Sequence, residues 1–185
     1  MSTPAPSLTL HEAARPLLDF YQRGGVAPPE LIPIEGDAMP EPYRRLLVHA
    51  DDMTPTLEQF HGDRIHLRPI THETRGNIYC REVILEAGEA NKPVEFGAIA
   101  IFLDRYPEPA RELILGDSVP LGTILNDYNI LHESCPQAYF QVNSDPLITE
   151  ALGLVNSTSL FGRCNIHRDL NGDNIAEIVE ILPPT

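Results

Sequence analysis

Two short runs of the chain combine the apolar pattern of a buried strand with charged residues in their middle. Residues 78–85 (IYCREVIL) and 175–182 (IAEIVEIL) are apolar at positions that point to both faces of a sheet, which predicts strands covered on each side. The charged residues within them are Arg81, Glu82, Glu177 and Glu180. Because an ionised group taken out of water costs about 5 kcal/mol even after its surroundings relax, each of these groups needs an opposite charge or an ordered ligand.

Two interpretations of these charges remain open at the level of the residues. An arginine of one strand can pair with a glutamate of the other and form a core ion pair. Alternatively, the arginine binds an anionic ligand in a pocket while a glutamate acts on the other end of that ligand. In either case these four side chains are where the function is to be sought.

The composition limits what the chain can bind. Its 185 residues fit one domain with a sizeable core, and they carry 27 acidic against 13 basic side chains, a formal net charge of -14. This charge repels a polyanion, so we expect no nucleic-acid partner. An anionic small molecule would need a locally basic pocket, and few arginines can supply one, which draws attention to Arg81.

The sequence shows no targeting or membrane segment. The first thirty residues contain charged side chains and no continuous apolar block, which predicts neither a signal peptide nor a membrane span. We therefore expect a cytoplasmic protein, with a monomer as the default state. The three cysteines are widely separated and have no CxxC spacing, which predicts reduced thiols.

Periodicity and turn signals predict an α+β fold with a single, largely antiparallel sheet flanked by helices. Residues 1–9 are rich in Ser, Thr and Pro and are expected to be frayed. Helices are predicted at residues 10–22, 43–49, 54 onward, 107–115, 120–128 and 145–152, and strands at residues 64–70, 78–85, 94–103, 138–142, 159–170 and 174–182. Asn171-Gly172 predicts a tight hairpin turn with positive φ at both residues.

Two predicted helix starts and one late arginine are further candidates. Asp52 or Thr54 can cap the helix that opens at Thr54-Pro55, and the free backbone N–H groups of this helix entrance could receive an anion. Pro120-Leu121-Gly122 presents a second helix N-terminus, which by itself reads as a capping feature. Gly162-Arg163 can bring a second cation to a pocket or simply end a turn.

The segment that starts at Asp169 offers five ligand positions of a calcium-binding loop. However, the sixth position, which is normally Gly, is Asn174, and the flanks have the pattern of strands where a calcium-binding hand needs two helices. A hairpin explains the same residues more simply. A calcium-dependent interaction protein is therefore kept only as a third function class.

The sequence predicts no metal site, no cofactor and no covalent catalysis. Histidines that lack an HExxH pattern, and that we expect to be solvated, are His49, His61, His66, His72 and His132. The chain has no GxSxG motif and no phosphate-binding glycine loop, and neither Ser nor Cys stands in a recognisable nucleophile setting.

Seven short motifs, in this order, carry a resemblance to a known family. They are Asp52-Met53-Thr54, Leu57-Glu58-Gln59, Arg81-Glu82-Val83-Ile84-Leu85, Pro93-Val94-Glu95-Phe96-Gly97, Pro120-Leu121-Gly122, Gly162-Arg163 and Glu180-Ile181-Leu182-Pro183. From about residue 46 to residue 184 the chain resembles the chorismate pyruvate-lyase family, the enzymes that make 4-hydroxybenzoate. The resemblance implies a chorismate lyase-like domain over residues 46–185, with a ligand sealed in an internal cavity under helical flaps. Residues 1–45 would be an N-terminal extension packed on or near that domain.

The resemblance also implies roles for single residues. Arg81 would pair with the ring carboxylate of chorismate, assisted by the backbone N–H groups of Met53 and Leu121, and Arg163 would line the same site. Glu180 would meet the oxygen at C4 and act as the acid that protonates it as it leaves. The implied reaction releases pyruvate without cofactor or metal and supplies 4-hydroxybenzoate to ubiquinone biosynthesis or another phenolic pathway.

The same architecture serves as an effector-binding module in some transcription regulators. The alternative function is therefore a non-catalytic binding module or sensor for an aromatic or sugar-like carboxylic acid.

Overall fold

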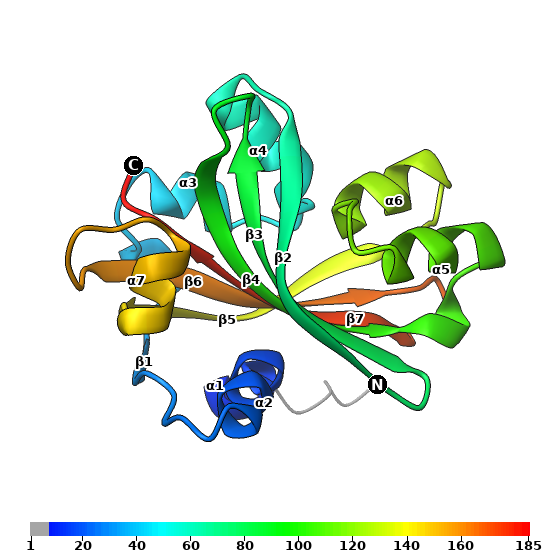
Figure 1. Cartoon of the computed structure of the whole chain (residues 1–185), viewed down its shortest axis with the longest axis horizontal. Coiled ribbons are helices and arrows are strands. Elements are labelled where there is room, and N and C mark those ends of the chain that lie inside the picture. Colours follow the sequence, from blue (N-terminus) through cyan, green and yellow to red (C-terminus); the bar gives the residue numbers. More distant parts are fainter. Residues whose placement is uncertain (1–7) are drawn as a thin grey trace, which may run out of the picture.

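A single antiparallel sheet of seven strands forms the centre of the molecule in a computed structural model that describes residues 8–185 (Figure 1). The strands are β1 (Leu31–Pro33), β2 (Ile65–Arg75), β3 (Ile78–Ala87), β4 (Lys92–Phe102), β5 (Glu133–Asn143), β6 (Ser159–Arg168) and β7 (Asn174–Leu182). Their order across the sheet is β1-β5-β6-β7-β4-β3-β2, and every neighbouring pair is antiparallel. The predicted fold class, α+β with one antiparallel sheet flanked by helices, is confirmed.

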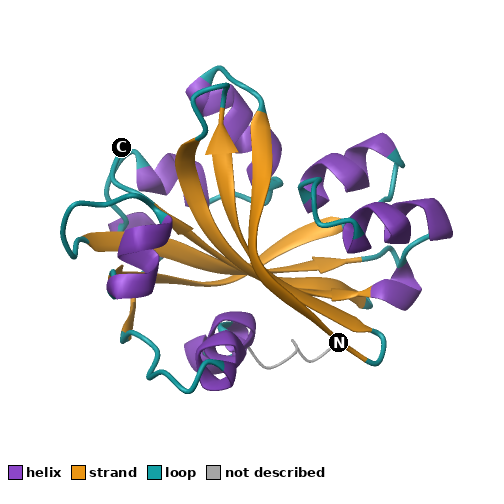
Figure 2. Cartoon of the chain, viewed as in Figure 1, coloured by secondary structure: helices purple, strands orange, loops and turns teal. Residues whose placement is uncertain are grey.

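Helices lie on both faces of this sheet (Figure 2). They are α1 (Leu10–Ala13), α2 (Arg15–Arg23), α3 (Tyr43–Leu47), α4 (Met53–His61), α5 (Glu108–Leu115), α6 (Leu121–Asp127) and α7 (Pro146–Ala151), with short 3₁₀ turns at Gly36–Ala38 and Leu103–Arg105. On one face α1, α2 and α7 pack around Ile84 and Phe96, and on the other α5 and α6 cover Ile99 while α3 and α4 cover Val83. None of the helices described in residues 8–185 is long and apolar enough to cross a membrane.

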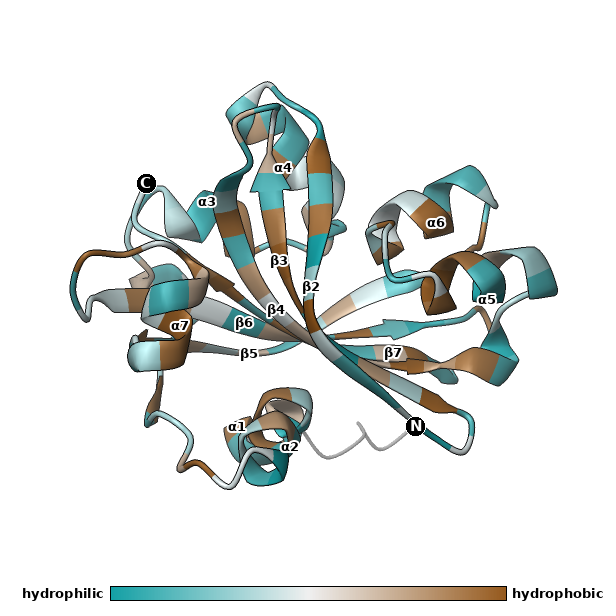
Figure 3. Cartoon of the chain, in the orientation of Figure 1, coloured by the Kyte–Doolittle hydropathy of each residue, from teal (hydrophilic) through white to brown (hydrophobic). Residues whose placement is uncertain are grey.

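The two-sided cover explains the apolar pattern of the central strands. From Tyr79 to Ala87 every residue of β3 is buried, because helices pack on both of its faces. Hydrophilic bands interrupt the apolar ones along the strands (Figure 3). Arg81 and Glu82 are such interruptions in β3, and because neighbours in a strand point to opposite faces they lie under different helices.

The described part of the first 45 residues shares the core with the rest of the chain. Leu17 of α2 is fully buried in the same cluster as Phe96 of β4. Arg23, at the end of α2, donates to Glu82 at 2.8 Å and pairs with Glu73 at 3.2 Å. Residues 31–33 add the edge strand β1 beside β5. Residues 1–7, part of the segment expected to be frayed, lie outside the described residues.

Several predicted elements differ in detail from the structure. The helix expected over residues 10–22 is divided at Ala14, which leaves the helical region with ψ near 8°. The strand expected at residues 138–142 extends over Glu133–Asn143 and carries a bulge between Pro136 and Ala138, where the proline cannot donate to the ladder. β1 is a three-residue edge strand that ends in a proline, too short to produce a periodic signal.

The tight two-residue turn predicted at Asn171-Gly172 is wrong. Five residues, 169–173, connect β6 to β7, and within this loop only Gly172 has a positive φ, of 84°. The Asp169 carboxylate accepts the backbone N–H groups of Asn171 and Asp173 at 2.9 and 3.0 Å. The loop therefore closes around an aspartate side chain instead of two residues in the left-handed region.

Candidate functional site

A cavity of about 60 Å³ lies between the sheet and the N-terminal ends of α4 and α6. Four of the residues that the sequence analysis proposed line it, namely Arg81, Glu180, Met53 and Leu121. The fifth, Arg163, is fully buried and contacts Glu180. The structure thus brings the proposed residues to one place, and it puts each of the two central charges beside a partner of its own.

The strand register separates Arg81 from Glu180. Arg81 in β3 lies opposite Ile99 of β4, and Glu180 in β7 lies opposite Gly97 of β4. The two charged residues are therefore two strands and two residues apart on the same face, which places their Cα atoms about 12 Å apart at ordinary strand spacing. An ion pair between these two side chains, one of the interpretations left open by the sequence, does not form.

Arg81 pairs with Asp117, which lies in the loop before α6. Its Nη1 is 3.2 Å from Asp117 Oδ1, and its Nη2 donates to the carbonyl oxygen of Val119 at 3.1 Å. The Nε of Arg81 is buried and has no hydrogen-bond partner within residues 8–185. Asp117 adopts the left-handed region at φ 54°, uncommon for a residue other than glycine, and its other oxygen is 3.1 Å from His72 Nδ1.

Glu180 pairs with Arg163, its direct neighbour across β6 and β7. Arg163 also donates to the backbone carbonyl oxygens of Leu47, His49 and Asp51 at 3.3, 3.1 and 3.1 Å. Burial lowers the pKa of Arg163, but the Glu180 carboxylate outweighs burial and leaves that pKa above its ordinary value. A core ion pair is therefore present, but it joins Glu180 to an arginine of β6 and not to Arg81 of the other strand run.

Glu95 is a cavity residue to which the sequence analysis gave no role. It is 4% exposed, it lines the cavity, and its Oε2 has no hydrogen-bond partner in the described chain. Burial, together with the nearby charge of Glu180, raises the pKa of Glu95 well above its ordinary value, which favours the protonated form of the carboxyl group. The feature of the sequence that drew attention to Arg81, a charged residue within an apolar strand run, is also found at Glu95.

The other charges of the two strand runs lie away from the cavity. Glu82 faces α2, and burial raises its pKa to about 7 although Arg23 opposes the shift. Glu177 is partly exposed and accepts a hydrogen bond from the Asn174 side chain at 3.3 Å.

The cavity is closed where α4 meets α6. Gly122 lies against Thr54 so closely that a Cβ atom at Gly122 would be 2.9 Å from Thr54 Oγ1. Outside this contact a groove of about 590 Å³ runs between the two helices, and it shares Asp52, Thr54, Pro120 and Gly122 with the lining of the cavity. The groove and the cavity therefore adjoin each other at this contact.

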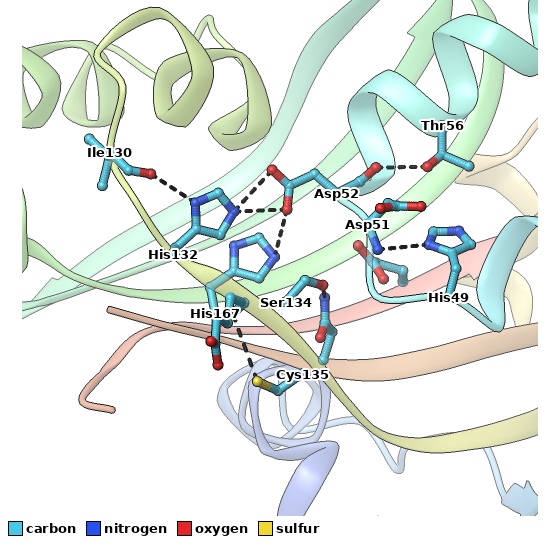
Figure 4. Close-up of polar contacts among 12 residues, drawn as sticks. His49, Asp51, Asp52, Thr56, Ile130, His132, Ser134, Cys135 and His167 are labelled. Atoms are coloured by element: carbon cyan, nitrogen blue, oxygen red, sulfur yellow. Dashed lines mark hydrogen bonds and ion pairs between the residues drawn. The ribbon is translucent and has the colours of Figure 1, made fainter. Parts of the chain in front are cut away.

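Asp52, His132 and His167 form a cluster at the start of α4 (Figure 4). Asp52 occupies the N-cap position but makes no side-chain bond to the first turn of α4 in the described chain, and its two oxygens are 2.9 and 3.0 Å from His132 Nε2. His167 Nε2 is 3.5 Å from Asp52 Oδ1. Burial raises the pKa of Asp52, but the hydrogen bond from His132 and the nearby cations outweigh it and lower that pKa, and burial lowers the pKa of His167 to about 4. The sequence analysis did not consider His167, which lies among apolar residues of β6.

No model of a known protein family and no curated protein sequence matches the chain. Among solved structures it is similar to PhnF from Mycobacterium smegmatis, with a TM-score of 0.57 and 12% identity over 74% of this chain and 65% of that one. A gene product from Staphylococcus aureus is similar with a TM-score of 0.53 and 4% identity, over 74% of this chain and 90% of that one. A GntR-family transcriptional regulator from Bacillus cereus has a TM-score of 0.47 and 10% identity, over 65% of this chain and 92% of that one.

At these identities the first two likenesses show the fold alone, and the third is too weak to add to them. The chain spans less than two thirds of the length of PhnF. None of these three structures is described as a chorismate lyase.

Proposed function

We propose that this chain is a binding module for a small aromatic carboxylic acid, with Arg81 as the group that receives the carboxylate. The observation that carries the proposal is the guanidinium at the cavity wall. Arg81 is 1% exposed, and its buried Nε–H has no acceptor among the described residues. A guanidinium presents forked donors that match a carboxylate, and a buried donor without a partner costs stability until a ligand supplies one.

The remainder of the cavity suits an aromatic ring with an oxygen substituent. Apolar side chains of Val83, Ile99 and Ile178 line it between the charged ends, and Gly97 leaves the floor free of a side chain. A Cβ at Gly97 would lie 3.2 Å from Glu95 Oε1 and would narrow this floor. At the far end lies the carboxyl of Glu95, whose pKa burial raises, and in its protonated form this group donates a hydrogen bond to a ligand oxygen.

The partner of Glu180 favours binding over catalysis. In the lyase interpretation Glu180 acts on the oxygen at C4 of the ligand, yet both of its carboxylate oxygens already accept hydrogen bonds from Arg163. These oxygens are therefore engaged by the protein itself. The resemblance also implies that the same architecture serves as an effector-binding module in some transcription regulators.

The size of the cavity sets a condition on binding. Small-molecule sites commonly measure about 300–1,000 Å³, whereas this cavity measures about 60 Å³. We therefore expect α4 and α6 to separate at the contact of Thr54 with Gly122 when the acid enters, and to close over it afterwards.

Calorimetric titration of the purified chain with 4-hydroxybenzoate tests the proposal, with phenol as the matched probe that lacks the carboxylate. Binding of the acid, weaker or absent binding of phenol, and a loss of about 30-fold or more in affinity in Arg81→Met are expected. Because Arg81→Met removes the arginine partner of Asp117, Arg81→Met/Asp117→Asn serves as the charge-balanced variant. Arg111→Met on the surface of α5 is the control. Equal affinity of the wild type and the double variant would refute the role of Arg81.

Pyruvate elimination from chorismate is the second candidate, and the raised pKa of Glu95 is the observation that favours it. A cavity carboxyl with a raised pKa is the kind of group that can protonate a departing ether oxygen. Mixing the chain with chorismate and following pyruvate release and the aromatic product separates the two candidates. Release that disappears in Glu95→Gln would support the lyase with Glu95 as the acid, and binding without release would support the binding module.

A further inference from the structure

Asp52, His132 and His167 converge from three segments far apart in the sequence, the start of α4, the segment before β5, and β6 (Figure 4). One ligand atom from each lies within 4.8 Å of the others. His132 and His167 stack side by side with their ring centroids 4.8 Å apart, and the Nε2 atoms of both rings lie near the Asp52 carboxylate.

The hydrogen bonds of His132 fix which nitrogen faces the carboxylate. Its Nδ1 is 2.9 Å from the carbonyl oxygen of Ile130, and because a carbonyl only accepts, Nδ1 carries the hydrogen. A protonated ring donates from Nε2 to the Asp52 oxygens at 2.9 and 3.0 Å, whereas a neutral ring presents a lone pair to them. Two acceptors at this distance repel each other unless a proton or a metal ion lies between them. A backbone carbonyl that orients the far nitrogen is also the usual outer contact of a histidine that ligates a metal.

His167 supplies the second observation. It is 3% exposed, and neither of its ring nitrogens has a hydrogen-bond partner within residues 8–185. Its Nε2 lies 3.5 Å from Asp52 Oδ1, too far for a good hydrogen bond and close to the separation of two ligands on one ion. Ligand atoms at about 2.1 Å from a metal are about 3.0–3.4 Å apart at octahedral or tetrahedral angles.

We propose that Asp52, His132 and His167 bind a divalent first-row transition metal ion such as Zn²⁺. Two imidazoles and one carboxylate are borderline ligands that suit this class of ion better than Ca²⁺ or Mg²⁺. Asp52 and His167 also line the cavity, so coordination positions not taken by the protein open toward it. The site does not depend on the acid ligand, because all three ligands belong to the chain.

Calorimetric titration of the chelator-treated full chain with ZnCl₂, repeated with Co²⁺ and followed by visible absorption, tests the site. One ion per chain is expected, with affinity reduced more than about 10-fold in His167→Gln and in Asp52→Asn. His132→Gln provides the same test at a less buried ligand if a variant at His167 does not fold. His11→Ala, on the opposite face of the sheet, is the histidine control.

Cys135→Ser excludes a thiolate ligand from the partly exposed Cys135, and it should leave the affinity unchanged. Absence of saturable binding up to about 1 mM Zn²⁺ would overturn the proposal. Affinity that is unchanged in the Asp52 and histidine variants, or that is lost in Cys135→Ser, would overturn it as well.

Discussion

Removal of the Arg163 guanidinium should destabilise the fold more than any other single change at the cavity. Arg163 is fully buried, neutralises Glu180, and donates to the carbonyl oxygens of Leu47, His49 and Asp51, so it ties the segment before α4 to the sheet. Breaking a buried ion pair by removing one partner costs about 3–5 kcal/mol, because the remaining charge stays in a low-dielectric environment.

We expect Arg163→Met, which keeps most of the volume, to lose about 4 kcal/mol of unfolding free energy. For a chain of 185 residues this corresponds to a decrease in melting temperature of about 8–16 °C. The double variant Arg163→Met/Glu180→Leu removes both charges, so it should be more stable than Arg163→Met alone by about 2 kcal/mol.

Urea unfolding followed by far-UV circular dichroism measures both values, with the slope of the transition as a check that the unfolded state is unchanged. Arg111→Met, at a partly exposed position, is the matched control and should change stability by less than about 0.5 kcal/mol. A loss below about 1 kcal/mol in Arg163→Met would refute the reasoning, since the pair would then be no more than a solvated surface pair. Strictly additive losses at Arg163 and Glu180 would refute it too.

Two further predictions concern the opposite face of the sheet and its packing. Because burial raises the folded-state pKa of Glu82 from 4.5 to about 7, the folded chain retains a proton that the unfolded chain releases. Stability should therefore fall between these two pH values by about 1.4 kcal/mol per pH unit relative to Glu82→Gln, as measured by urea unfolding across the range. Gly162→Ala should lose more than about 2 kcal/mol, because its Cβ would lie 2.5 Å from the Glu180 carbonyl oxygen and from Phe140 Cζ, whereas Gly24→Ala, with no contact under 3.5 Å, should be nearly neutral by thermal melting.

Most of the fold could be predicted from local patterns. β3 and β7 were predicted because each is a run of apolar residues bounded by turn residues, a pattern that is visible in the sequence itself. Pro120 is a similarly local signal, and it marked the start of α6. β1 was missed because three residues show no period, and the loop after β6 was misjudged because the Asp169 side chain replaces a backbone turn. Hydrogen bonds from the backbone to an aspartate side chain compete with the tendency of Asn-Gly pairs to form a two-residue turn.

The partners at the site could not be predicted in the same way. The rule that a buried charge needs a partner selected Arg81 and Glu180 correctly as buried groups, but Asp117 and Arg163 reach them through sheet register and loop closure, which no single run contains. His167 was missed because a single histidine in an apolar strand has no motif. The role proposed for His167 depends on its contact with Asp52, which is more than one hundred residues earlier in the chain.

The two proposed sites should influence each other, because Asp52 and His167 line the same cavity as Arg81. Arg81 with Asp117 and Glu180 with Arg163 are neutral pairs, so an acid that enters adds one uncompensated negative charge to a chain of net charge -14. A divalent ion at Asp52 would offset that charge and hold the start of α4 over the ligand. Linkage then requires that Zn²⁺ raise the affinity for 4-hydroxybenzoate by the same factor by which 4-hydroxybenzoate raises the affinity for Zn²⁺. Titrations in both orders measure this factor, and a value of one would show that the two sites are energetically independent.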